Sequence, residues 1–202
     1  MQNAPASDAS PAPDRLGAWL LRALLAALLL FAAEFLLWND PLGRDPLDWA
    51  LRLPAYLLLA ALLLDVLMRY RVRDLWGAML ALGIYAIGHA VLLNPQRAFA
   101  LIPDSLLTNA LGAQWTVGLE AFGLWLVLLL GGRAMREKRL LLMSAFILGF
   151  TWATWVLWLP AFNPGIFRAV NLIEMFGGML LGALPGLLLW GIIRRRPPRL
   201  PA

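Results

Sequence analysis

Long runs of apolar residues, separated by short polar and proline-containing segments, make up most of this chain. Each run approaches the roughly 20 residues that an α-helix needs to cross a bilayer. The pattern predicts six such helices, over the segments Leu16–Trp38, Trp49–Met68, Leu75–Pro95, Trp115–Gly132, Leu140–Leu159 and Ala169–Ile193. We therefore expect an all-α, polytopic membrane protein.

The polar segments suggest that the six helices are arranged as three hairpins. An asparagine and a proline follow the first, third and fifth apolar runs, at Asn39–Pro41, Asn94–Pro95 and Asn163–Pro164, and such pairs are turn signals. We expect residues 15–196 to form one six-helix domain. Residues 1–14 are rich in Pro, Ala and Ser and should be a disordered tail, and residues 197–202 a short second tail.

The connection between the third and fourth predicted helices is longer than the others. Within it, Pro103 precedes LLTNAL and Gly112 follows, which predicts the start and the stop of a short helix lying in the membrane interface.

The distribution of basic residues predicts the orientation of the chain in the membrane. Only four of the 17 Lys and Arg residues fall in the connections after the odd-numbered helices or beside them: Arg44, Arg52, Arg97 and Arg168. The other 13 lie near the two ends of the chain and in the segments 69–73 and 133–139. Because cytoplasmic loops carry the excess of Lys and Arg, both termini should be cytoplasmic, and a bacterial-type inner membrane is the expected location.

Composition strengthens the membrane interpretation and removes several others. The chain is 61% hydrophobic and 14% charged, whereas soluble domains carry roughly 25% charged residues. The net charge of +5 follows from basic residues at the ends of apolar runs, so we expect a lipid bilayer and not nucleic acid as the partner. The chain has no cysteine, and its one histidine cannot supply a multi-histidine metal or haem site.

Four ionisable residues lie inside the predicted spans, where a charge is expensive and by default marks a functional site. They are Glu34, His89, Glu120 and Glu174, each on a different helix and at similar depth below the outer surface. We expect these residues, together with Tyr85 one turn before His89, to bind a small solute or cation in an outward-facing acidic pocket. Arg52 or Arg168 would neutralise one of the carboxylates.

Small residues predict the inward faces of two helices. Glu174 shares a stripe with Gly178, Gly182 and Gly186, and such ladders allow another helix to approach closely. That neighbour could belong to this chain or to a second membrane protein. On the third helix, Ala81, Tyr85 and His89 stand four residues apart and should also face inward.

Three functions are compatible with these features. The favoured one is binding or transport of a small solute or cation. The alternative is a non-catalytic subunit or assembly factor that docks through its glycine face. An enzyme that modifies lipid, with a carboxylate and His89 as acid and base, is the least favoured. The four polar residues could also form a purely structural cluster. We expect no cofactor, and the residues do not specify a metal.

The predicted topology can be tested by cysteine labelling in intact cells. Cysteines at Asn39, Asp104 and Asn163 should react with a membrane-impermeant reagent added outside, whereas cysteines at Val72 and Met135 should not, because positive-inside orientation places those loops in the cytoplasm. Labelling at Met135 would contradict the six-helix arrangement.

Overall fold

The computed structural model describes residues 14–36, 46–72, 74–100, 102–103, 106–130 and 172–195. Within these ranges every regular element is a helix, and no strand occurs. The elements are α1 (Arg15–Leu30), η1 (Phe31–Leu36), α2 (Pro46–Arg69), α3 (Leu75–Leu93), α4 (Pro95–Ala100), η2 (Leu106–Gln114), α5 (Trp115–Leu130) and α7 (Leu172–Arg195). The elements η1 and η2 are π-helical. The expected all-α fold is therefore confirmed for the described chain.

Four helices are long and apolar enough to cross a membrane: Arg15–Phe35, Ala50–Arg69, Trp76–Leu93 and Ala110–Leu129. They correspond to the first four predicted spans, and α7 covers most of the sixth. The fifth span, 140–159, lies outside the described residues. The count of six spans, the three-hairpin arrangement and the orientation remain predictions.

Capping and turn residues set several helix ends. The carboxylates of Asp14 and Asp74 cap α1 and α3 by accepting hydrogen bonds from the backbone N–H groups of Gly17 and Gly77, at 2.9 and 3.1 Å. As predicted, α3 stops before Pro95, with Asn94 as its C-cap. The predicted stop at Gly112 is wrong, because η2 continues through it into α5. One glycine in a helix costs only about 1 kcal/mol, which packing of the neighbouring turns readily offsets.

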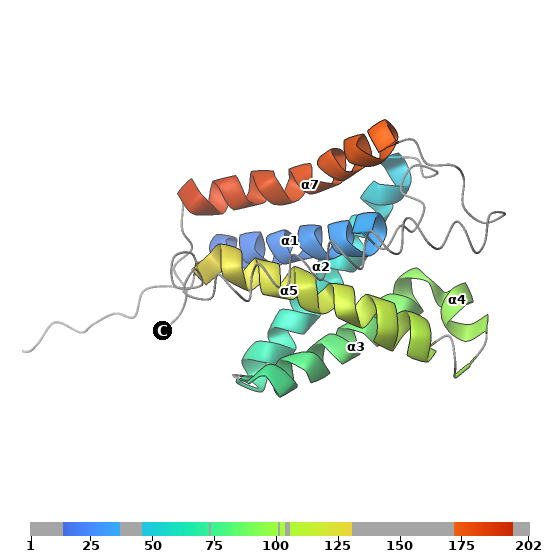
Figure 1. Cartoon of the computed structure of the whole chain (residues 1–202). Helices are drawn as coiled ribbons and strands as arrows, with labels where there is room; N and C mark the ends of the chain where they lie inside the picture. Colours follow the sequence, from blue (N-terminus) through green and yellow to red (C-terminus); the bar gives the residue numbers. More distant parts are fainter. Residues whose placement is uncertain are drawn as a thin grey trace, which may run out of the picture.

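The helix α1 forms the centre of the bundle, where it contacts α2, α5 and α7 (Figure 1). Its own buried side chains are leucine and alanine, and the four consecutive residues from Leu24 to Ala27 are buried, so the middle of the helix is enclosed on all sides. The helices α2 and α3 bury only one face each. On α3 the buried residues include Ala81, Tyr85 and His89, so the inward face predicted from their spacing is confirmed.

Two tryptophans tie α5 to its neighbours through hydrogen bonds to backbone carbonyls. Trp125 Nε1 donates to the Leu21 carbonyl on α1 at 3.0 Å, and Trp115 Nε1 donates to the Met79 carbonyl on α3 at 2.9 Å. Between them, Gly118 lies so close to the Tyr85 ring that an added Cβ would be 3.0 Å from it. These contacts hold α5 against α1 and, beside Tyr85, against α3.

The helix α7 meets the centre of the bundle through the predicted glycine face. A Cβ at Gly182 would overlap the ring of Phe35 in η1, with 2.6 Å to its Cδ2 and Cζ atoms. A Cβ at Gly186 would lie 3.7 Å from Leu28 Cδ2, an ordinary van der Waals distance. At these two glycines the face is therefore occupied by α1 and η1 of the same chain, and the side-chain position of Gly178 lies outside the described part.

The different space around Gly182 and Gly186 gives a matched pair of variants. Gly182→Ala should destabilise the protein by about 1–3 kcal/mol, because the buried Phe35 ring has to move. Gly186→Ala should be neutral or slightly stabilising, because alanine favours helix and the space exists. Thermal unfolding in one detergent would measure both, and equal melting temperatures would contradict the close α7–η1 contact.

Candidate functional site

The site begins at Glu34, the acidic residue in the π-helical turn η1 that continues α1. Four successive residues of this turn, from Ala32 to Phe35, are buried, and Glu34 itself is only 1% exposed. A π-helical turn widens the helix and is frequent at functional sites. The carboxylate of Glu34 is thus directed into the bundle and not toward lipid.

The charge of Glu34 is neutralised by Arg52, which projects from the early part of α2. Arg52 Nη1 donates to Glu34 Oε1 at 2.6 Å, a short charge-assisted contact. The two side chains differ in their surroundings, because that of Arg52 is 22% exposed while that of Glu34 is almost fully buried. Arg52 is therefore the end of the site that still contacts the surroundings of the bundle.

Tyr56 lies one turn further along α2 and extends the contact inward. Its hydroxyl donates to the same Glu34 oxygen at 2.9 Å, and the side chain is fully buried. Arg52 and Tyr56 are four residues apart, so α2 presents both on one face toward η1. One carboxylate oxygen thus accepts hydrogen bonds from two groups of α2.

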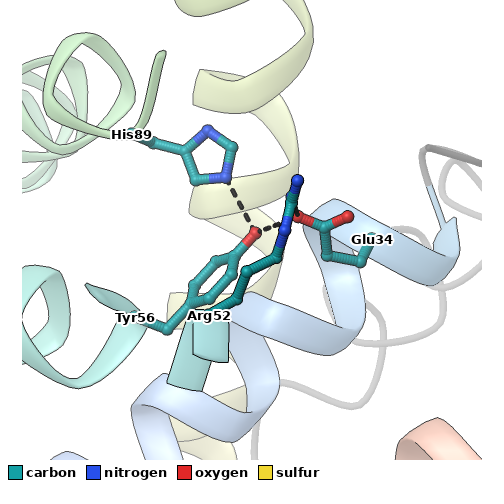
Figure 2. A network of polar contacts seen from close by, with 4 residues as sticks. All are labelled: Glu34, Arg52, Tyr56 and His89. Carbon is teal, nitrogen blue, oxygen red and sulfur yellow. Dashed lines mark hydrogen bonds and ion pairs between the residues drawn. The ribbon is translucent and has the colours of Figure 1, made fainter. Parts of the chain in front are cut away.

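His89 of α3 completes the site on the far side of Tyr56. Its Nε2 atom lies 2.8 Å from the Tyr56 hydroxyl, and the ring is fully buried (Figure 2). The rings of Tyr56 and Tyr85 lie beside the imidazole, with centroid distances of 5.4 and 6.0 Å. We call Arg52, Glu34, Tyr56 and His89 the polar network.

The ion pair assigns the direction of the hydrogen bonds. Because Glu34 is paired with Arg52, its carboxylate is ionised and only accepts, so Tyr56 uses its single hydroxyl proton toward Glu34. The Tyr56 oxygen must then accept from His89, which places the imidazole proton on Nε2. The other nitrogen, Nδ1, is therefore a buried acceptor, and no described residue donates to it.

The structure brings together only some of the residues predicted for the site. Glu34 and His89 join through Tyr56, and Tyr85 packs against His89. Glu120 lies half-buried on α5 and takes no part in the polar network. Glu174 belongs to α7, but its side chain lies outside the described part, as does Arg168. Among the described residues, no group of three or more His, Asp and Glu side chains gathers in a way that could hold a metal ion.

Sequence analysis named Arg52 only as one of two candidate counterions and overlooked Tyr56. A signal for Tyr56 does exist, because its hydroxyl lies in an apolar helix one turn after an arginine near the start of that helix. A buried tyrosine hydroxyl needs a hydrogen-bond partner, which should direct it toward other polar groups in the bundle.

Removing the counterion should reveal how strongly the fold depends on this pair. Arg52→Leu leaves a buried carboxylate without its cation, which costs about 3–5 kcal/mol at comparable sites. Because Arg52 is partly exposed, we expect the lower end of that range. Adding Glu34→Gln should restore most of the stability, since the uncompensated charge is then gone.

Denaturant titration in mixed micelles would measure these changes in unfolding free energy. Arg69→Leu is a suitable control, because Arg69 is exposed in the last turn of the same helix and should change stability by no more than about 0.5 kcal/mol. An Arg52→Leu variant as stable as this control would contradict the proposed contribution of the ion pair to the free energy of unfolding.

No family model, no curated protein and no solved structure matches this chain, so the geometry of the polar network carries the functional conclusion.

Proposed function

We propose that this chain is a multi-pass inner-membrane protein that binds a small solute or cation at the polar network and passes it across the membrane. The observation that carries the proposal is His89 Nδ1, a fully buried acceptor without a donor among the described residues. It lies at the inner end of a network whose other end, Arg52, retains contact with the surroundings.

The free-energy cost of burying the charged groups of the polar network supports a functional role over a structural one. Replacing a buried ion pair with apolar side chains is often neutral or stabilising, so stability alone gives little reason to retain one. Here the charged and polar groups come from three helices that are each apolar enough to cross a membrane. Ionisable residues in such surroundings commonly mark substrate or ion pathways.

The arrangement of donors and acceptors favours a particular kind of solute. The carboxylate of Glu34 already accepts from Arg52 and Tyr56, so the network as a whole is electrically neutral. The group that seeks a partner is the acceptor His89 Nδ1. A solute that offers an N–H or O–H donor, including a protonated amine, would satisfy it better than a bare metal cation would.

The alternative of a subunit or assembly factor has less support. It relies on the glycine face of α7, and at Gly182 this face packs against Phe35 of the same chain. The exposed apolar side chains of α2 and α3, among them Leu58, Leu62 and Ile84, are what lipid contact requires and indicate no protein partner by themselves.

Solute binding can be tested with purified protein in lipid nanodiscs. We would equilibrate it with a pooled extract of small metabolites, recover the protein and identify the retained compounds by mass spectrometry. His89→Ala should weaken retention of a specific compound about tenfold or more, because it removes the unpaired acceptor. Leu58→Ala, on the exposed face of α2, should retain it like the wild type. Equal retention by wild type and His89→Ala would contradict the site.

A further inference from the structure

The polar network also has the geometry of a site for a proton. Its three inner members form an unbroken chain of hydrogen bonds, from His89 Nε2 to the Tyr56 hydroxyl at 2.8 Å and from there to Glu34 Oε1 at 2.9 Å. At its inner end, His89 Nδ1 is buried and receives no hydrogen bond from any described residue. A proton is the smallest species that this nitrogen accepts.

We infer that the network takes up one proton at His89 Nδ1 and stores it on Glu34, with the imidazole left neutral. The transfer balances in three steps. A proton binds to Nδ1, the proton on Nε2 passes to the Tyr56 oxygen, and the original Tyr56 proton passes to Glu34 Oε1. Afterwards Glu34 donates to Tyr56, Tyr56 donates to His89 Nε2, and every hydrogen bond of the chain has reversed its direction.

The surroundings of the four groups explain why the proton ends on Glu34 and not on the imidazole. A protonated His89 would add a third charge to the network, at a site with no exposure. Protonated Glu34 instead leaves one charge, on Arg52, whose side chain is 22% exposed. Since buried charges carry a large desolvation cost, the state with one partly exposed charge is favoured.

The buried titratable groups on α2 and α3 are members of the network or contact it. The helix α3 contributes Tyr85 next to His89, and α2 contributes Arg52 and Tyr56. The other ionisable side chains of α2 are exposed, namely Asp48, Asp65 and Arg69. The elements η2 and α5 contain one ionisable side chain, the half-buried Glu120. The helix α7 packs on η1 and carries Glu174, whose side chain lies outside the described part.

A consequence of this transfer is that protonation of Glu34 changes the interaction between Arg52 and Glu34. Once Glu34 is neutral, Arg52 Nη1 faces an uncharged carboxyl group, so the ion pair between these two side chains is lost and their contact is weakened. Protonation therefore weakens the only ion pair between η1 and α2 within the described residues. This inference uses the residues of the proposed solute site but requires no solute, so each can fail without the other.

The single histidine of the chain makes the test unambiguous. In protein labelled with ¹⁵N-histidine, only His89 gives imidazole nitrogen signals, and these distinguish the Nε2–H tautomer, the Nδ1–H tautomer and the imidazolium. We would record them in lipid nanodiscs without added solute, from about pH 8 to about pH 5, the range in which imidazole ordinarily titrates. The wild type should change from the Nε2–H to the Nδ1–H tautomer.

The matched variants are Tyr56→Phe and Tyr70→Phe. Tyr56→Phe removes the hydroxyl whose donation selects the Nδ1–H tautomer, so the acid-induced change of tautomer should be lost. Tyr70→Phe alters an exposed tyrosine at the end of α2 and should behave like the wild type. A wild type that becomes imidazolium, or that keeps the Nε2–H tautomer over the whole range, would overturn the inference. So would an unchanged tautomer switch in Tyr56→Phe.

Discussion

A carboxylate buried among apolar helices has to find its counterion inside the protein, because hydrocarbon supplies neither water nor ions. In this chain the counterion of Glu34 is Arg52, at 2.6 Å. The pair requires that η1 and α2 lie side by side at one end of the bundle, with Glu34 directed inward. Tyr56 donates to the same carboxylate and contacts His89, so the polar side chains of three helical segments meet at this point.

The central helix makes this arrangement possible. Because α1 is surrounded by α2, α5 and α7, its continuation η1 lies within the bundle, and the four residues from Ala32 to Phe35 are buried. The π-helical form of this turn is of a kind frequent at functional sites. Gly182 of α7 leaves room for the ring of Phe35, the residue after Glu34 in η1, so the glycine stripe lets α7 pack closely on the turn that carries Glu34.

The two proposals share a structural basis but differ in what they require. Solute binding depends on the acceptor at His89 Nδ1 and on access to it, whereas proton uptake depends on the continuity of the hydrogen bonds through Tyr56. If both hold, protonation reverses the direction of the hydrogen bonds through Tyr56. It also places a proton on His89 Nδ1 and so turns this acceptor into a donor. Proton uptake would then weaken binding of a solute that itself donates, which is a simple form of coupling.

The sequence by itself determined the helical class, the positions of four helices apolar enough to cross a membrane, the end of α3 at Asn94 and the inward face of α3. These follow from local rules: the length of apolar runs, proline chemistry and the four-residue spacing of Ala81, Tyr85 and His89. It also singled out Glu34 and His89, because ionisable residues are conspicuous in apolar segments.

Only the tertiary structure decided how these residues combine. The sequence left Arg52 and Arg168 as alternative counterions, because pairing between helices depends on distances in space that sequence separation does not encode. It could not direct Tyr56 toward Glu34, since α2 is apolar on both its buried and its lipid-facing sides and hydropathy does not distinguish them. It could not foresee the π-helical turn or the continuation through Gly112 either, because packing against neighbouring helices overrides local preference there.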